Sequence, residues 1–381
     1  MKVLALTSIR SDYDLLSPLY QLLHNDSEID FKLLVSGAHL SKEFGYTKQY
    51  IEKDGFNILV EIETLINSDS LSSRLKTASI FLQNSIDIIF KYSPDVILYA
   101  GDREDVMMGG LLGMYLNIPT IHFYGGDHEN DGHQDTYVRH ATSKLSSLHF
   151  VALESHKKRL ISMGENTSSI YNIGSVSLDK FHSFKKKDIQ SLLKREDFLK
   201  FALVIYHPLQ DENSGEVFQN ILTVLEKKKI QAIVSYPNSD PGYIGINNVI
   251  NKNITNKNFI FYKNLERDLF LTIFSRCEFI IGNSSAGIYE AASVKKAAIN
   301  VGFRQMNRES SDNVVFCNIE KNSIHEAINK VNTIVFQEKL SNIQNIYGDG
   351  NSAKKAYSLI KNLNLKEFIP KVYDPLMMEE K

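Results

Sequence analysis

The chain has little cysteine and no long hydrophobic run. Only Cys277 and Cys317 occur among its 381 residues, and they are far apart in the sequence. A disulfide framework or a thiolate metal site would need more cysteines in closer groups, so we expect both thiols to be reduced and no metal to be bound. No apolar stretch approaches the roughly 20 residues that a membrane helix needs. The first apolar residues soon give way to Arg10, which is not typical of a signal peptide. We therefore expect a cytoplasmic protein with no membrane partner.

A strong charge of either sign is also missing. The chain has 43 basic and 45 acidic residues, which gives a formal net charge of −2. Without an excess of basic residues there is no electrostatic footprint for nucleic acid or for an anionic membrane surface. The 43% of hydrophobic and 23% of charged residues are typical of an ordinary globular protein. Nucleic acid and membrane are therefore both disfavoured as partners.

Short β-rich runs alternate with helical patterns along most of the chain. In the first half the expected strands are Val3–Leu6, Phe31–Val35, Ile58–Val60, Val96–Tyr99, Thr120–Phe123 and Leu148–Val151. In the second half they are Phe201–Tyr206, Ala232–Ser235, Phe259–Tyr262, Phe279–Ile281 and Ala298–Val301. Continuous apolar strands separated by helices are typical of parallel sheets that are covered on both faces. The predicted fold class is therefore α/β, with two doubly wound, Rossmann-like domains.

The expected domain boundary is the Lys-, Ser- and Asp-rich stretch 177–196, which has little strand character. A length of 381 residues is too great for one ordinary core. We assign residues 1–180 to the first domain, 181–365 to the second and 366–381 to a charged tail. The last expected helix, near 352–363, is a candidate to pack back on the first domain.

Unusual side chains follow directly after several of the expected strands. Ligands of doubly wound sheets bind beyond the carboxyl ends of the strands, so these positions are candidate site residues. Arg10 follows the first strand, and its guanidinium could bind diphosphate oxygens or be a plain surface charge. Asp102 follows the strand 96–99, where a carboxylate could do acid–base work or cap the next helix.

The segment from Gly125 to His140 is the richest in titratable groups. It follows the strand 120–123 and holds four carboxylates and three imidazoles, including the carboxylates of Asp127, Glu129 and Asp135. Crowded carboxylates push their pKa values apart, so that one site supplies both an acid and a base. A metal site is the rival interpretation, because Asp and His are good ligands. The lack of a helical His-x-x-x-His pair in the sequence favours acid–base catalysis.

Further candidates lie after strands of the second half. His207 ends the strand 201–206, and the run 282–290 follows the strand 279–281 and opens a helix. The amides of a helix start and the hydroxyls of Ser284 and Ser285 can bind a phosphate, and small residues allow a close backbone approach. Glu290 suits a ribose diol. A serine N-cap is the plain alternative for this run, and a lone histidine is more often structural.

Taken in order, these motifs resemble the hydrolysing UDP-N-acetylglucosamine 2-epimerases, enzymes of sialic and legionaminic acid biosynthesis with a glycosyltransferase-B-like fold. The resemblance covers nearly the whole chain and implies an active site in the cleft between the two domains. It rests on Arg10–Tyr13, Val35–Leu40, Gly101–Arg103, Arg139-His140, Lys144–Ser146, His207-Pro208, Tyr236–Asn238, Gly282–Glu290, Asn300–Gln305 and Arg308.

The resemblance implies a reaction and residue roles. A base removes the C2 proton of the sugar while the nucleoside diphosphate leaves C1, and water then adds to the glycal. UDP-N-acetylglucosamine would give free N-acetylmannosamine and UDP, without a cofactor. The implied acid–base groups are Asp102, the acid after Gly125-Gly126, and Asp135, with His207 and Arg10 at the diphosphate. The implied binding residues are His39, Arg139, Asn238, Ser284, Ser285, Gly287, Glu290 and Arg304. A homodimer or homotetramer is also implied.

One departure affects the substrate assignment. The family pattern is Gly-Gly-Glu, whereas this chain reads Gly125-Gly126-Asp127-His128-Glu129, so either Asp127 or Glu129 takes that role. A UDP- or GDP-linked diacetamido sugar such as diacetylbacillosamine is therefore as acceptable as UDP-N-acetylglucosamine. The remaining alternatives are a non-hydrolysing 2-epimerase, a retaining glycosyltransferase and an inactive nucleotide-sugar sensor.

Overall fold

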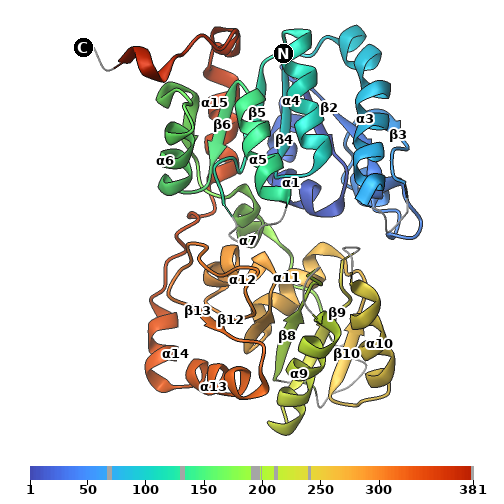
Figure 1. Cartoon of the computed structure of the whole chain (residues 1–381), viewed down its shortest axis with the longest axis vertical. Coiled ribbons are helices and arrows are strands. Elements are labelled where there is room, and N and C mark those ends of the chain that lie inside the picture. The colour runs from blue at the N-terminus through green and yellow to red at the C-terminus, as the bar shows by residue number, and fades with distance from the viewer. Residues whose placement is uncertain are drawn as a thin grey trace. The chain divides into compact units, whose positions relative to one another are not determined.

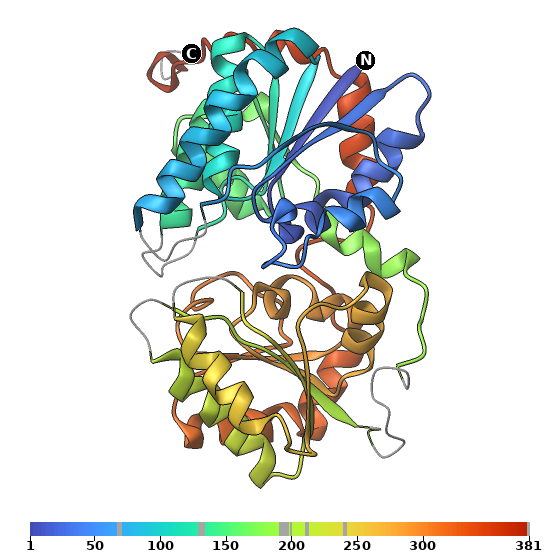
Figure 2. The same cartoon turned by 90° about the vertical axis from the view of Figure 1, so that its right-hand side faces the viewer.

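The computed structural model of the chain divides into two compact units (Figures 1 and 2). It describes residues 1–66, 71–128, 134–189, 198, 200–209, 213–238 and 242–378. Among the described residues, unit 1 comprises those in 1–128, 134–179 and 350–378, and unit 2 comprises those in 180–349. In the described ranges no helix is long and apolar enough to cross a membrane.

Unit 1 is built on a seven-stranded sheet in which all neighbouring strands are parallel. The strand order is β3-β2-β1-β4-β5-β6-β7. Its strands β4, β5 and β6 are buried at every position and mostly apolar, as expected for a sheet covered on both faces. The strands are β1 (Lys2–Thr7), β2 (Asp30–Ser36), β3 (Ile58–Ile62), β4 (Val96–Ala100), β5 (Thr120–Phe123), β6 (Leu148–Val151) and β7 (Ile170–Asn172).

Helices cover both faces of this sheet, as Figure 2 shows for unit 1. On one face α4 packs between α3 and α5, and on the other α1 packs against α15. The core under α3 and α4 uses Leu4, Leu6 and Tyr99 of the sheet. The helices of unit 1 are α1 (Arg10–Asn25), α2 (Lys48–Lys53), α3 (Leu71–Tyr92), α4 (Glu104–Leu116), α5 (Gln134–Leu145), α6 (Glu154–Ser162) and α15 (Ser352–Asn362).

Unit 2 contains a six-stranded sheet, again with parallel neighbours, in the order β10-β9-β8-β11-β12-β13. Alternate residues of β8 enter two different cores, Ala202 and Val204 on one face, Leu203 and Ile205 on the other. The strands are β8 (Phe201–Ile205), β9 (Gln231–Ser235), β10 (Phe259–Tyr262), β11 (Phe279–Gly282), β12 (Ala297–Val301) and β13 (Val314–Cys317). The helices are α7 (Lys180–Ser183), α9 (Ser214–Lys227), α10 (Tyr243–Asn253), α11 (Arg267–Arg276), α12 (Ser285–Tyr289), α13 (Lys321–Val331) and α14 (Ile334–Ser341).

The C-terminal part of the chain lies in unit 1. The sequence assigned residues 181–365 to the second domain, with the last helix as a candidate to pack on the first, and in the structure residues 350–365 belong to unit 1. The backbone amides of Ser352 and Ala353 donate to the carboxylate of Asp179, and Tyr357 and Lys361 of α15 donate to Asp26 after α1. The charged tail is also anchored, because Lys371 donates to Glu165. These long-range contacts leave no periodic signal in the sequence.

Each sheet reverses its strand order at one point. In unit 1 the reversal lies between β1 and β4, and in unit 2 between β8 and β11. Such switch points open a crevice beyond the carboxyl ends of the strands, where doubly wound folds bind ligands. Arg10 and Asp102 follow β1 and β4, and His207 and Ser284 follow β8 and β11. Both groups of candidate residues therefore lie at switch points.

Candidate active site

Arg139 joins two of the predicted carboxylates at the switch point of unit 1. It lies on α5 and its side chain is 4% exposed. One terminal nitrogen donates to Asp127 at 2.7 Å, and the other donates to Asp102. A buried guanidinium needs such partners, since an unpaired charge there would be costly. The fork shape of arginine thus fixes the distance between the two carboxylates.

Asp127 is more deeply enclosed than a catalytic acid would require. Its side chain is 4% exposed; Oδ1 accepts from the His128 amide at 2.8 Å and lies 3.4 Å from Nε2 of His156. With Arg139 on Oδ2, both oxygens have protein partners. Asp127 therefore serves as an anchor for Arg139, which differs from its predicted catalytic role. Glu129, the other candidate for that role, lies outside the described residues.

The loop that carries Asp102 is held by a buried histidine that the sequence did not single out. Nε2 of His122, on β5, lies 2.8 Å from the carbonyl oxygen of Gly101, and Nδ1 lies 3.1 Å from Oγ of Ser143. Burial lowers the pKa of His122 to about 3, so the ring is neutral and donates one hydrogen to Gly101. The sequence pattern does not indicate this role, because His122 lies inside a mainly apolar strand.

Neighbouring atoms of the protein leave no room for a side chain on Gly125 or Gly126. A side chain on Gly126, which has a φ of 77°, would come within 2.3 Å of the His156 carbonyl oxygen. One on Gly125 would come within 3.0 Å of the Ser143 hydroxyl. The two glycines therefore allow close packing of this turn against α5 and α6.

Asp135 has a partner that was not predicted. It lies in the first turn of α5, one turn before Arg139, and its Oδ1 accepts from Arg74 of α3 at 3.0 Å. Nε of Arg74 also donates to Glu104, the first residue of α4. Asp135 is half-buried. Through Arg74 it is linked to Glu104, which lies two residues after Asp102.

Arg10 opens α1 and remains half-buried. Its guanidinium lies 3.4 Å from Asp14 and 4.7 Å from the ring centre of Tyr50. The preceding loop is organised by Asp12, whose Oδ2 accepts from the Ser8 hydroxyl at 3.0 Å and from the Ser8 and Ile9 amides at 3.3 Å. Burial, helped by the charge of Asp105, raises the pKa of Asp12 to about 7. Asp12 thus organises the loop before Arg10.

His39 does not fit its predicted role in substrate binding. Its ring is wholly buried, and its nitrogens lie 3.0 Å from the Thr7 hydroxyl and 2.8 Å from the Thr47 hydroxyl. Burial lowers its pKa to about 4. We correct this assignment, because a ring with both nitrogens paired inside the protein joins β1 to the start of α2.

In unit 2, His207 is fixed by Asn283 of the neighbouring strand end. The Asn283 side chain accepts from the His207 amide at 2.7 Å and donates to the His207 carbonyl at 2.8 Å. Nδ1 of His207 accepts from the amide of Asn238 at 3.3 Å. A neutral ring with this bond carries its proton on Nε2, the nitrogen suited to donate to an anion. Asn238 therefore acts here through its main chain.

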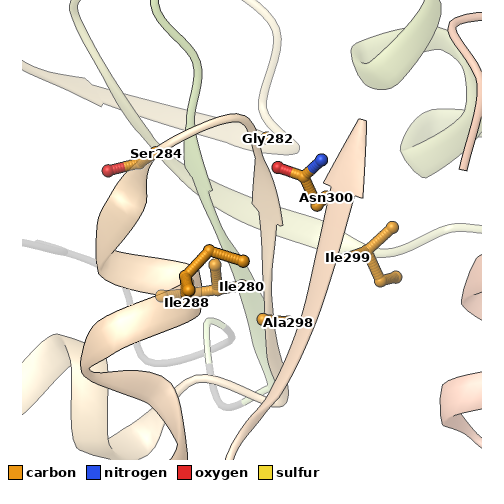
Figure 3. A pocket seen from close by; sticks show the side chains of 8 residues that line it. Ile280, Gly282, Ser284, Ile288, Ala298, Ile299 and Asn300 are labelled. Atoms are coloured by element: carbon orange, nitrogen blue, oxygen red, sulfur yellow. The ribbon is translucent and has the colours of Figure 1, made fainter. Parts of the chain in front are cut away.

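The predicted phosphate turn begins with a tight backbone approach. Gly282 has a φ of 145°, and a side chain there would meet the Ile205 carbonyl oxygen at 1.9 Å. Ser284 caps α12 by accepting from the Ala286 amide at 3.3 Å, and Ser285 is exposed. Figure 3 shows Ser284 at the top of α12, pointing away from β11 and β12.

The hollow drawn in Figure 3 is a packing gap beneath this turn. It holds about 10 Å³, roughly enough for one water molecule, and is lined mainly by apolar side chains such as Ile280 and Ile288. Gly287 lies over the sheet, where a side chain would approach Ala298 to 3.3 Å. The small size of Gly287 therefore serves packing of α12, and any ligand of this turn would bind above the gap.

The two remaining candidates of unit 2 have protein partners. Glu290 is buried and lies 2.7 Å from Nζ of Lys180. Arg304 donates to the Asn283 carbonyl oxygen at 3.3 Å, so it supports the same turn that fixes His207. Within the described ranges no group of three His, Cys, Asp or Glu side chains is arranged to hold a metal ion.

Comparisons with known proteins agree on one family. The family described as UDP-N-acetylglucosamine 2-epimerase matches residues 21–361. The hydrolysing UDP-N,N'-diacetylbacillosamine 2-epimerase of Legionella pneumophila is 35% identical over 373 residues, which cover 96% of each chain. The hydrolysing GDP/UDP-N,N'-diacetylbacillosamine 2-epimerase of Campylobacter jejuni is 31% identical over 347 residues, 88% of this chain and 89% of that one.

The fold is also similar to that of solved structures. UDP-N-acetylglucosamine 2-epimerase from Neisseria meningitidis, bound to UDP-N-acetylglucosamine, superposes with a TM-score of 0.80. The match covers 95% of this chain and all of that one, at 20% identity, and so bears on the fold alone. The family match and the two relatives show that the chain belongs to the UDP-N-acetylglucosamine 2-epimerase family.

Proposed function

We propose that the chain is a hydrolysing 2-epimerase that converts a nucleotide-linked acetamido sugar and water into the free 2-epimeric sugar and a nucleoside diphosphate. The observation that carries the proposal is the placement of two half-buried carboxylates, Asp102 directly after β4 and Asp135 in the first turn of α5, the helix whose buried Arg139 holds Asp102. The names of the Legionella and Campylobacter relatives support the hydrolysing form of the reaction.

The reaction needs a base, an acid and stabilisation of the leaving group. In our proposal Asp102 and Asp135 are the acid–base pair, because both are half-buried carboxylates that follow strands of the unit 1 sheet. One removes the C2 proton while the C1–O bond to the diphosphate breaks, which gives a glycal. Protonation at C2 and addition of water at C1 then give the free sugar.

The diphosphate is assigned to groups that can donate hydrogen bonds. Nε2 of His207 and the hydroxyls of Ser284 and Ser285 lie at the switch point of unit 2, and Arg10 lies at that of unit 1. Positive charge and hydrogen-bond donors stabilise the negative charge that develops as the diphosphate leaves. Glu290 is assigned to the ribose, where it would exchange its bond with Lys180 for one with the diol.

For the sugar, we favour a diacetamido sugar of the diacetylbacillosamine type over N-acetylglucosamine. The two relatives at 35% and 31% identity carry that substrate in their names. Asp127 in place of the family's glutamate is a change in the same segment as Asp135. The two names also leave UDP and GDP as the nucleotides to compare.

The test offers UDP- and GDP-linked N-acetylglucosamine and diacetylbacillosamine to the purified chain, without any acceptor. Release of nucleoside diphosphate is followed by chromatography, and the sugar is identified by NMR. In D₂O the released 2-epimer should carry deuterium at C2, since the glycal is protonated from solvent. Asp102→Asn should lower turnover by about 10²–10⁴-fold. An epimerised sugar still attached to its nucleotide would instead establish the non-hydrolysing reaction, and turnover only with an acceptor would establish a glycosyltransferase.

We further propose a homo-oligomer located in the cytoplasm. Leu75 and Phe90 of α3, Tyr115 of α4 and Tyr137 of α5 are exposed on three helices that pack side by side, a surface typical of a protein interface. Both cysteines are buried and unpaired, in keeping with a reducing compartment. Light scattering of the wild type and of Phe90→Glu would test the interface.

A further inference from the structure

Arg74 contacts the starts of two helices from a third. It lies in the first turn of α3, its Nε donates to Glu104 at the first position of α4, and its Nη2 donates to Asp135 at the second position of α5 at 3.0 Å. The two acceptors belong to helices that follow adjacent strands of the sheet, β4 and β5. Arg74 therefore links the Asp102 loop with the helix that carries Asp135 and Arg139.

The three side chains share one half-buried environment. Their exposed fractions are 34% for Arg74, 17% for Glu104 and 23% for Asp135. Two carboxylates so close to one cation would repel each other if the guanidinium were absent. Both carboxylates lie in the first turn of a helix, where a negative charge interacts favourably with the helix dipole. The two carboxylates bind different nitrogens of the planar guanidinium, so each contact has a fixed direction.

We infer that Arg74 is a positioning residue that aims the Asp135 carboxylate and keeps it ionised for proton abstraction. This inference rests on the proposed function, in which Asp135 belongs to the acid–base pair. Arg74 acts through Asp135 and does not itself touch the reacting atoms. Glu104 occupies Nε of Arg74 and so leaves Nη2 directed at Asp135.

A purely structural tether is the alternative, and it makes a different prediction. The contact between α3 and α4 is already built from apolar side chains, including Phe81, Val106 and Met108. If Arg74 only tied helices together, its loss would lower thermal stability and the amount of active protein. It would not change the pH at which Asp135 takes up a proton. The readout must therefore be the protonation of Asp135.

The experiment compares Arg74→Gln, Arg74→Lys and the wild type, with Lys91→Gln as a control that removes an exposed charge from the other end of α3. The pH dependence of kcat and kcat/KM is measured for nucleoside diphosphate release. In Arg74→Gln the acid limb should move up by about one pH unit or more, and kcat should fall about 10–100-fold while KM changes little. Arg74→Lys keeps the charge but not the fork, so its acid limb should stay near that of the wild type with a smaller loss of kcat.

A second measurement needs no turnover. Carbodiimide coupling of an amine modifies protonated carboxylic acids, and mass spectrometry of the peptide containing Asp135 gives the pH at which labelling is half complete. This pH should be higher in Arg74→Gln than in the wild type and in Lys91→Gln. Equal labelling midpoints in the folded proteins would overturn the inference whether or not the enzyme turns over. If the wild type released no nucleoside diphosphate while the labelling midpoint still moved, the proposed function would fail and the coupling of Arg74 to Asp135 would stand.

Discussion

The side-chain amide of Asn283 makes two hydrogen bonds to the main chain of His207, accepting from its amide at 2.7 Å and donating to its carbonyl at 2.8 Å. Asn283 is completely buried and follows β11, whereas His207 follows β8, the neighbouring strand. The pair therefore fixes a histidine at the switch point of unit 2. Arg304 and Gln305 donate to the Asn283 carbonyl oxygen, each at 3.3 Å, and hold the turn from its other side.

Asn283→Ala should lower nucleoside diphosphate release about 10–100-fold, because the loss of two buried hydrogen bonds frees the His207 main chain. Rates at saturating substrate measure this effect, and Asn251→Ala, at an exposed position of α10, is the control. Because Asn283 acts through His207, the double variant Asn283→Ala/His207→Ala should be no slower than His207→Ala. Multiplicative losses would contradict that dependence.

Separate replacement of Asp127 and Glu129 should give different results. Asp127→Asn replaces one of the two carboxylate partners of the buried Arg139 with a neutral amide, so the melting temperature should fall by several degrees. Glu129→Gln should lower turnover about 10²–10⁴-fold if Glu129 is the acid that the family pattern has after Gly125-Gly126. Calorimetry and a rate assay on both variants check this. A stable Asp127→Asn without activity, beside a fully active Glu129→Gln, would return the role to Asp127.

The sequence predicted the strands best where they are apolar and central. All eleven expected strands occur, with ends within about two residues, because continuous burial requires continuous apolar runs. The edge strands β7 (Ile170–Asn172) and β13 (Val314–Cys317) were missed, because they are short and partly polar or exposed. Edge elements bury less and so carry a weaker pattern.

The sequence indicates site residues that directly follow strands. It does not indicate residues whose role depends only on tertiary contacts. Asp102, Asp127 and Arg139 come together as a group, although two of them serve partly to hold the third. Arg74 lies on a helix, and His122 lies inside an apolar strand, so neither position looks unusual in the sequence. Their significance depends on which helices and strands are neighbours, which spacing along one chain does not reveal.

Asp12 should make the folded chain less stable as the pH rises. Its pKa is about 7 in the folded chain against 3.8 for an ordinary aspartate, because burial and the nearby Asp105 oppose ionisation. The folded chain therefore binds more protons than the unfolded chain between these values, and the free energy of unfolding falls over that range and stays lower above it. Three pH units correspond to an upper limit on the order of 4 kcal/mol.

Asp12→Asn removes this penalty and keeps an oxygen to accept from Ser8 and Ile9. Urea unfolding should show the variant gaining stability relative to the wild type between pH 5 and pH 8. Asp87→Asn, at an exposed position of α3, should show no such gain. A constant difference between Asp12→Asn and the wild type across this range would mean that Asp12 does not titrate there.

Lys371 should stabilise unit 1 from the C-terminal tail, although the residue is exposed. Its Nζ lies 2.6 Å from the buried Glu165 and donates to the carbonyl oxygens of Lys144 and Ser146, at the end of α5, at 3.0 and 2.9 Å. Burial alone would raise the pKa of Glu165, but bonds from His149, Lys144 and Lys371 hold it at about 2. Lys371→Met removes one of these cations from a buried carboxylate, which should lower the free energy of unfolding by about 1–3 kcal/mol. Urea unfolding at neutral pH checks this, with the exposed Lys366→Met as control. Equal urea midpoints for the two variants would mean that Lys371 contributes no more to stability than an ordinary surface charge. A lower midpoint for Lys371→Met alone is the expected result, because only that variant loses the ammonium group that binds Glu165 and the last carbonyl oxygens of α5.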